Sequence, residues 1–226
     1  MVADLVEGLD CAGVEVDANY PTGFQLKARS DDGSDPAVEY FRRGSAASRL
    51  SPAMVSPVWL QARHVHATGI PLALSDSCRA LSHALLDGMR AAGRSISFDP
   101  NLRPSLWPDQ SSMVREINAL AAKADWVLPG LEEGRLLTGQ HTPADIAAFY
   151  LDQGVELVVI KLGDAGAYFR SAKGEGQVAP VPVSRVVDTV GAGDAFAVGV
   201  LSALLEGRPV AEAVARGNWC GSLWCW

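Results

Sequence analysis

Apolar residues along this chain follow two different spacings, and each spacing predicts a different kind of element. Val155–Lys161 is a continuous apolar and β-branched run, typical of a strand buried on both faces. Between Ser75 and Ala92 the apolar residues instead recur every three or four positions, which predicts a helix with one buried stripe. The predicted strands are Arg63–Thr68, Arg94–Asp99, Asp125–Leu128, Val155–Lys161, Ala167–Arg170 and Gln177–Val183. The predicted helices are Ala3–Leu9, Ser75–Ala92, Ser111–Lys123, Thr142 to about Gln153, one after Gly193 and one from Pro209.

The alternation of strands and helices argues for an α/β fold, a mainly parallel sheet covered by helices on both faces. Ahead of that sheet, two strands of mixed polar character are predicted at Thr22–Arg29 and Ala37–Arg42, on either side of the turn-rich Ser30–Pro36. Such a hairpin fits an exposed β flap, residues 22–43, better than a buried strand. We expect residues 1–226 to form a single domain that carries this flap.

Composition and charge exclude several classes of protein. The chain is 48% hydrophobic and 20% charged, the balance of a globular protein, and its net charge of −7 argues against nucleic acid or an anionic membrane as partner. The longest apolar stretch, Ala195–Leu205, is too short to span a bilayer. Acidic residues near the start argue against a signal peptide. The four cysteines lack CxxC spacing, so we expect reduced thiols and a cytoplasmic location.

The sharpest chemical signal is the segment DTVGAGDAF, residues 188–196. Gly191, Ala192 and Gly193 leave little side-chain bulk at the start of a predicted helix, whose first amides form a ready anion hole. Asp194 follows at the rim of that hole. A carboxylate there fits a general base that removes the proton from a hydroxyl attacking a phosphoryl group. The competing interpretation is a helix N-cap aspartate after a tight glycine turn.

The longer string favours the first of these interpretations. Its six fixed residues would arise by chance in a chain of this length with a probability on the order of 10⁻⁵ to 10⁻⁴. The string resembles the C-terminal signature of the PfkB, or ribokinase-like, family of carbohydrate kinases. This resemblance implies a ribokinase-like fold, Asp194 as catalytic base and Gly191–Gly193 as anion hole. P-loop and dinucleotide fingerprints are absent; Phe196 stands where the third glycine of the latter would fall.

Two further segments, Tyr40–Ser48 and Phe98–Trp107, resemble 2-keto-3-deoxygluconate kinases. An arginine fork matches the carboxylate of a sugar acid, and aromatic faces would cover the carbon skeleton. The competing interpretations are ordinary cross-strand packing for the aromatic residues and a solvated charged edge for the arginines. The substrate-binding residues that the resemblance implies are Phe24, Tyr40, Phe41, Arg42, Arg103 and Asp194.

The same resemblance implies an ATP site. Lys161–Gly166 matches the K-x-G-x-x-G turn of the family, although a glycine-rich hairpin turn looks the same. Mg²⁺ is expected to accompany ATP. No direct metal ligand is identified, because Gly130 replaces the Asn of the family's N-x-x-E while Glu133 remains. The implied nucleotide-binding residues are Asn101, Leu102, Arg103, Lys161, Gly163, Gly166, Gly191, Ala192, Gly193 and Asn218.

The leading hypothesis is therefore an ATP-dependent kinase that converts 2-keto-3-deoxygluconate to its 6-phosphate. We expect a chain truncated at both ends relative to the family, because the Gly-Gly-x-x-x-Asn segment is absent and the end is rich in Trp and Cys. The alternatives are a kinase of a neutral sugar such as fructose or ribose, an inactive nucleotide-binding fragment, or a dinucleotide-dependent oxidoreductase. Exposed flap strands also allow a homo-oligomer.

Overall fold

The computed structural model describes residues 14–28, 38–183, 186 and 189–224. The predicted helix Ala3–Leu9 and Asp188 of the motif lie outside these residues. A six-stranded sheet has the order β3-β4-β5-β6-β7-β8, in which the first four strands are parallel and the last two join antiparallel. The strands are β3 (His64–Thr68), β4 (Ser95–Asp99), β5 (Trp126–Val127), β6 (Leu157–Lys161), β7 (Ala167–Ser171) and β8 (Gly174–Val178).

Helices connect the strands, and most begin where the sequence supplies a cap. The Ser75 hydroxyl accepts from the Cys78 amide, and Thr142 caps its helix from the position just before a proline, as predicted. None of the described helices is long and apolar enough to cross a membrane. The helices are α1 (Ile70–Leu74), α2 (Asp76–Ala91), α3 (Gln110–Ala121), α4 (Leu131–Thr138), α5 (Pro143–Leu151), α6 (Ala192–Leu205) and α7 (Val210–Trp224).

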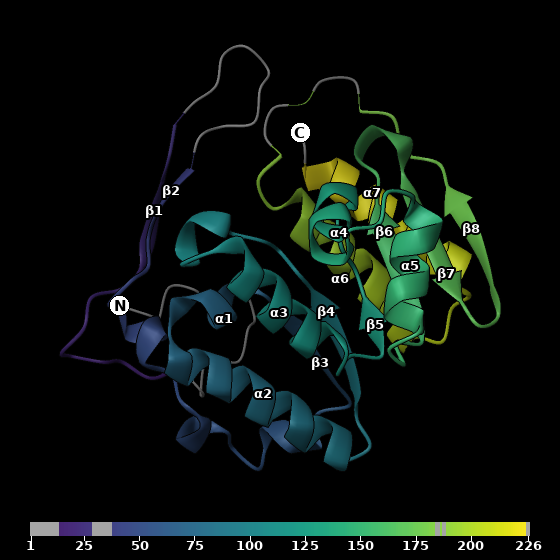
Figure 1. The fold of residues 1–226 in the computed structure, drawn as a ribbon. Coiled ribbons are helices and arrows are strands. Elements are labelled where there is room, and N and C mark those ends of the chain that lie inside the picture. Colours follow the sequence, from purple (N-terminus) through teal and green to yellow (C-terminus); the bar gives the residue numbers. More distant parts are fainter. Residues whose placement is uncertain (1–13, 29–37, 184–185, 187–188, 225–226) are drawn as a thin grey trace.

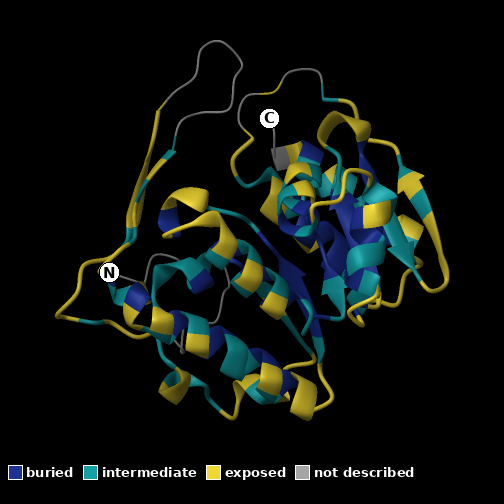
Figure 2. Ribbon diagram, in the orientation of Figure 1, coloured by how far each residue is buried: buried dark blue, intermediate teal, exposed yellow. Residues whose placement is uncertain are grey.

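Two apolar cores lie on opposite faces of the sheet, because alternate strand residues point to opposite sides. Ile96, Val158 and Ile160 face the core formed with α1 to α5. Leu157 and Val159 face the second core, formed with α6 and α7. Figure 1 shows the two helical layers, and Figure 2 shows the buried sheet between them. The predicted α/β sandwich with helices on both faces is confirmed.

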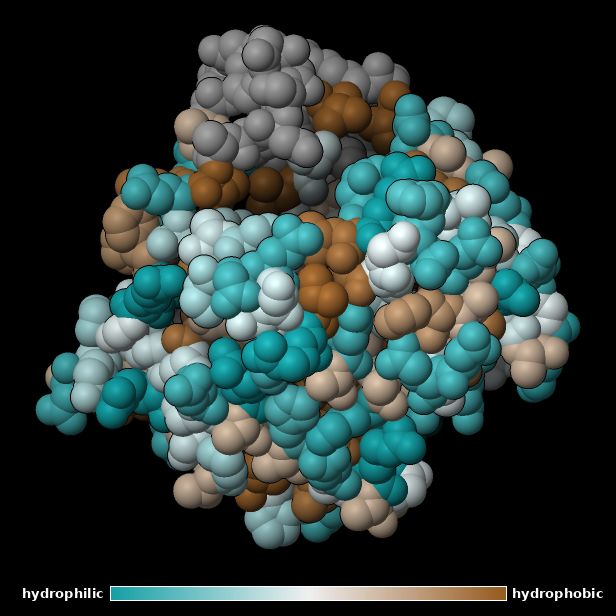
Figure 3. Space-filling view, in the orientation of Figure 1, coloured by the Kyte–Doolittle hydropathy of each residue, from teal (hydrophilic) through white to brown (hydrophobic). Residues whose placement is uncertain are grey.

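The flap is a separate two-stranded sheet, as predicted. β1 (Phe24–Lys27) pairs antiparallel with β2 (Val38–Phe41), and Phe24 lies opposite Phe41. Their rings stack with centroids 4.7 Å apart, and both rings remain exposed. Figure 3 shows hydrophobic residues gathered on this side of the molecule (upper left). The flap thus buries little apolar surface of its own within the described residues.

Two expectations about the elements were wrong or incomplete. β8 runs over Gly174–Val178, not Gln177–Val183. Its glycines pair with β7, whereas Pro180 and Pro182, which lack an N–H, fall where the chain has already left the sheet. The short helices α1 and α4 were not predicted. α1 has five residues, and α4, which follows Gly130 directly after the chain leaves β5, has eight, too few in either case to show a clear repeat.

Candidate active site

The N-terminus of α6 forms one wall of the candidate site. Gly191 precedes the helix with a φ of 91°, a conformation that favours glycine. The Ala192 amide donates to the carbonyl of Thr189 at 3.1 Å, so the amides of Gly193 and Asp194 are the ones left to meet an anion. Asp194 lies in the first turn. The predicted juxtaposition of glycine loop, helix start and carboxylate is present.

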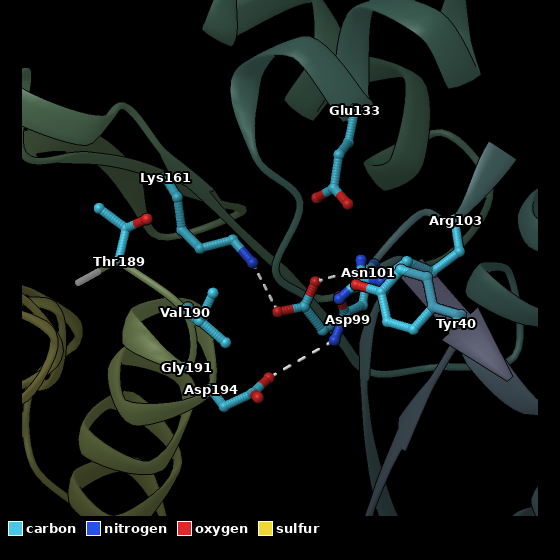
Figure 4. Close-up of a pocket in the computed structure, with 11 residues that line it drawn as sticks. Tyr40, Asp99, Asn101, Arg103, Glu133, Lys161, Thr189, Val190, Gly191 and Asp194 are labelled. Atoms are coloured by element: carbon cyan, nitrogen blue, oxygen red, sulfur yellow. Dashed lines mark hydrogen bonds and ion pairs between the residues drawn. The ribbon is translucent and has the colours of Figure 1, made fainter. Parts of the chain in front are cut away.

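The loop after β4 brings a second set of side chains to the same place. Asn101 adopts a φ of 41°, rare for a residue other than glycine. Its amide donates to Asp99 Oδ1 at 3.2 Å, which supports the turn. Its side-chain nitrogen donates to Asp194 Oδ1 at 3.4 Å (Figure 4). The ends of β4 and α6 therefore meet through one hydrogen bond to the predicted base.

Lys161, the last residue of β6, extends between these two walls. Its Nζ lies 2.5 Å from Asp99 Oδ2, and only 2% of Asp99 is exposed. Burial raises the pKa of the Asp99 carboxyl, and the neighbouring Lys161 ammonium opposes that rise. A Cβ added at Gly193 would lie 3.8 Å from Lys161 Nζ, so the ammonium stands against the start of α6.

The Glu133 carboxylate accepts hydrogen bonds from two loops of the site. One carboxylate oxygen accepts from the Leu102 amide at 2.7 Å, and the other accepts from the Gly130 amide at 2.8 Å. The second contact caps α4 at Gly130, the residue just before the helix. Among the described residues, no group of three or more His, Cys, Asp or Glu side chains could hold a metal ion.

These walls enclose a central cavity of about 300 Å³ that extends to the flap. Arg103 lies with its guanidinium 5.4 Å from the centre of the Tyr40 ring, and Arg42 lies 4.5 Å from the same centre. Among the described residues, the Arg103 Nε is buried and has no hydrogen-bond partner. Two guanidinium groups therefore lie near the Tyr40 ring, and of the two only Arg103 lines this cavity. The charged and aromatic side chains that line this cavity are Tyr40, Asp99, Arg103, Glu133, Lys161 and Asp194.

A flap cavity of about 550 Å³ adjoins the central one, and Tyr40 lines both. Phe24, Phe41 and Arg42 line the flap cavity, so the predicted sugar-acid residues divide between two neighbouring hollows. Arg42 Nη2 donates to Gln25 Oε1 at 3.0 Å across the flap. Of the predicted substrate-binding residues, Arg103 and Asp194 line the central cavity together with Tyr40.

A third hollow, the α7 cavity, lies on the other side of Lys161 and has a volume of about 440 Å³. Lys161 also lines the central cavity. Asn218 points its amide at the carbonyls of Val178 (3.2 Å) and Ala179 (2.8 Å), so it ties α7 to the end of β8. The predicted nucleotide-binding residues that line the α7 cavity are Lys161, Gly163, Gly166, Ala192, Gly193 and Asn218.

Some residues occupy positions that sequence reasoning did not anticipate. Leu102 was predicted to bind the nucleotide. Its side chain instead packs against the core formed with α1 to α5, and its amide donates to Glu133. Asp99 was not predicted as a site residue, yet it is the buried partner of Lys161. The sequence does contain a signal for Asp99. It is an acidic residue at the end of a buried strand, directly before a loop with Asn and Arg, and ligands bind at the carboxyl ends of parallel strands.

Comparison with known protein families and curated proteins identifies close relatives. A family model described as pfkB family carbohydrate kinase matches residues 6–225. A 2-dehydro-3-deoxygluconokinase of Bacillus subtilis (strain 168) is 51% identical over 220 residues, 96% of this chain and 67% of that protein. A protein of the same name from Thermoproteus tenax is 36% identical over 200 residues, 84% of this chain and 58% of that protein. A probable fructokinase-7 of Arabidopsis thaliana is 28% identical over 235 residues, 99% and 68% of the two chains.

Solved structures show the same architecture. A PfkB protein from Polaromonas sp. JS666 superposes with a TM-score of 0.90 and 53% identity, covering 98% of this chain and 72% of that one. A putative ribokinase II from E. coli, in complex with ATP and Mg²⁺, gives a TM-score of 0.77 and 28% identity over 84% of this chain and 61% of that one.

The chain therefore spans about 58 to 67% of the length of its first two curated relatives. The ribokinase-like fold and the family resemblance predicted from the glycine motif are confirmed. The family model covers nearly every residue, including the glycine motif and the flap. This chain belongs to the pfkB family of carbohydrate kinases.

Proposed function

We propose that the protein transfers the γ-phosphoryl group of ATP to the terminal hydroxyl of 2-keto-3-deoxygluconate. The observation that carries this proposal is the position of Asp194. Its carboxylate lies in the first turn of α6, beside amides that can hold an anion, and lines a cavity that also contains Lys161 and Arg103. A carboxylate among cations fits a base that works next to a phosphoryl group.

In this reaction Asp194 takes the proton from the acceptor hydroxyl. The hydroxyl oxygen forms a bond to the γ-phosphorus as the bond from that phosphorus to the bridging oxygen of ADP breaks. Asn101 holds one carboxylate oxygen of Asp194 and so orients the base. The amides of Gly193 and Asp194, with Arg103, face the charge that develops on the phosphoryl oxygens.

The two cations around Tyr40 favour a sugar acid over a neutral sugar. Arg42 and Arg103 lie 4.5 and 5.4 Å from the ring centre, so a carboxylate next to the ring would meet a guanidinium. The exposed Phe24–Phe41 stack offers an apolar wall to a carbon skeleton. The two relatives named 2-dehydro-3-deoxygluconokinase are also more similar to this chain than the probable fructokinase-7 is.

We place ATP in the α7 cavity, with its phosphates directed at Lys161 and the start of α6. This placement rests on the glycine turn Gly163–Gly166 and on the cavity's continuity with the helix N-terminus. Mg²⁺ would enter on the nucleotide phosphates and neutralise part of their charge. The E. coli relative was solved in complex with ATP and Mg²⁺, which supports ATP with Mg²⁺ as the phosphoryl donor.

The test is to incubate the 226-residue chain with ATP and Mg²⁺ and to measure ADP formation with 2-keto-3-deoxygluconate and with fructose. We expect turnover of the sugar acid. In the variant Arg42→Ala the KM for the sugar acid should rise at least tenfold, on the scale of one lost charge-assisted contact. Arg94→Ala serves as the matched control, because Arg94 is exposed at the opposite end of β4.

The outcomes separate the alternatives. Equal use of fructose, with no effect of Arg42→Ala, would replace the proposal with a kinase of a neutral sugar. ATP binding without ADP formation would favour a nucleotide-binding protein instead. Binding of NAD with no binding of ATP would point to the oxidoreductase.

A further inference from the structure

Lys161 is placed at the boundary between two cavities. It lines the central cavity, where Asp194 lies, and also the α7 cavity, where we place the nucleotide. Its ammonium stands near the start of α6, because a Cβ at Gly193 would lie only 3.8 Å from Nζ. A phosphoryl group that passes from the nucleotide to an acceptor at Asp194 would cross this boundary.

Asp99 is what holds the ammonium there. The distance from Lys161 Nζ to Asp99 Oδ2 is 2.5 Å, and the side chain of Asp99 is only 3% exposed, against 20% for Lys161. The carboxylate is thus a fixed anchor, while the cation reaches partly into the cavity. An ammonium has three donors, so one bond to Asp99 leaves two for another anion.

The other oxygen of Asp99 serves the same cavity. It accepts from the Asn101 amide at 3.2 Å, in the turn where Asn101 has a φ of 41°. The side chain of Asn101 in turn donates to Asp194. One buried carboxylate therefore supports both the cation at the boundary and the residue that contacts the base, as Figure 4 shows.

We propose that Asp99 is a positioning residue, which holds Lys161 at the boundary so that its ammonium binds the γ-phosphoryl group during transfer. This proposal rests on the kinase activity proposed above. Lys161 contacts the phosphoryl oxygens as the bond to ADP breaks and the bond to the acceptor oxygen forms, and the proton still goes to Asp194. Asp99 itself touches neither substrate and exchanges no proton.

The competing interpretation is a buried ion pair that only stabilises the fold. Such a pair is destabilising to break, because the remaining charge stays buried. The two interpretations differ in one respect. If Asp99 acts only through Lys161, its removal should cost nothing further in rate once Lys161 is gone.

The experiment is a double-mutant cycle on the 226-residue chain with Asp99→Asn, Lys161→Met and both changes together. For each protein we measure kcat and KM for ATP with the sugar acid, the Kd of ATP and of ADP, and thermal unfolding. Asp87→Asn with Lys123→Met is the matched control, since Lys123 Nζ lies 2.6 Å from Asp87 Oδ1 on the surface.

We expect Lys161→Met to lower kcat on the order of 10²-fold, like the loss of one preorganised donor. It should also weaken ATP binding more than ADP binding, because only ATP carries the γ-phosphate. Asp99→Asn should lower kcat about tenfold or more, with the KM of the sugar acid nearly unchanged, because Lys161 contacts the phosphoryl group and not the sugar acid. The double variant should regain thermal stability over Lys161→Met, since no buried charge is left unpaired, yet keep its low kcat.

Two results would overturn the inference. One is Asp99→Asn with the kcat and the ATP-to-ADP affinity ratio of the unaltered chain. The other is a double variant whose kcat falls below that of Lys161→Met by the full factor of Asp99→Asn. Failure of the proposed function looks different, because the unaltered chain would then give no ADP. In that case an unchanged ATP-to-ADP ratio in Lys161→Met would still overturn the inference, and a reduced ratio would support it.

Discussion

Asn101 donates its side-chain amide to Asp194 across 3.4 Å, although the two residues are 93 positions apart in the sequence. The contact joins the end of β4 to the first turn of α6. It leaves the second carboxylate oxygen of Asp194 outside this bond. In the proposed reaction that oxygen is the one available to accept the proton of the substrate hydroxyl.

Replacing the carboxylate tests this role directly. We expect Asp194→Asn to lower kcat by about 10²- to 10⁴-fold, the usual contribution of a general base, because an amide cannot take the proton. The Kd of ATP should change little. Asp152→Asn, at the exposed end of α5, is the control and should leave kcat as it is. Full activity in Asp194→Asn, measured as ADP release, would remove Asp194 from the mechanism.

Position 166 requires glycine both because its backbone conformation favours glycine and because there is no room for a side chain. Its φ is 84°, and a Cβ there would lie 2.1 Å from the carbonyl oxygen of Val178. Gly154 has a similar φ of 95° but open space around it. Gly154→Ala should therefore cost about 1–2 kcal/mol of unfolding free energy, the cost of a left-handed conformation alone.

Gly166→Ala should cost clearly more than that, because the backbone of β8 must also move. Urea denaturation of the two variants measures the difference, and ATP binding reports whether the α7 cavity is disturbed. Equal losses in the two variants would contradict the close packing of Gly166 against Val178.

Glu133 is predicted to hold the loop after β4 in place. Glu133→Gln keeps the size of the side chain but replaces one acceptor oxygen by a donor, so one of the amides of Leu102 and Gly130 loses its partner. We expect a loss of about 1–3 kcal/mol in unfolding free energy. The neighbouring Glu132 is exposed and pairs with Arg135, so Glu132→Gln is the control and should cost little. Urea denaturation measures the unfolding free energy of both variants. Similar losses of unfolding free energy in the two would argue against a role of Glu133 in holding the two loops.

Local sequence patterns could predict most strands of the sheet, but not the bounds of the last strand, β8. β6 is a continuous apolar run, and burial on both faces leaves that pattern visible. β8 contains Gly174 and Gly176 and is mostly exposed or half-buried, so neither spacing nor hydrophobicity marks it. Its position is set by pairing with β7, a contact that local patterns do not contain.

The site residues also fall into two groups, those that local sequence patterns could predict and those that they could not. The glycine motif could be recognised because its residues are consecutive and each has a local reason, such as the positive φ of Gly191. The Asp99–Lys161 pair joins residues 62 positions apart and exists only because β4 and β6 lie on either side of β5. Asn218 was predicted as a nucleotide-binding residue from resemblance, and the structure shows its side-chain amide donating to carbonyls at the end of β8.

A histidine on the edge strand predicts how stability depends on pH. His64 lies half-buried on β3, with Nδ1 2.8 Å from Ser95 Oγ, Nε2 2.8 Å from Ser97 Oγ, and its ring stacked on Trp126. The Ser95 hydroxyl donates to the Arg63 carbonyl, so a neutral ring with its proton on Nδ1 satisfies both serines. Burial lowers the pKa of His64 below its ordinary value of 6.5, although the nearby Asp125 opposes the shift.

Because this pKa is lower in the folded protein, the unfolded chain binds the proton more readily. The stabilisation is therefore fully present above pH 6.5 and is lost as the pH falls through the folded pKa. We expect the unfolding free energy, measured by urea denaturation at pH 7.5 and 5.5, to fall on acidification. That fall should be smaller in His64→Gln, which cannot be protonated, than in the control His141→Gln in an exposed loop. An equal fall in both variants would place the pH dependence in groups other than His64.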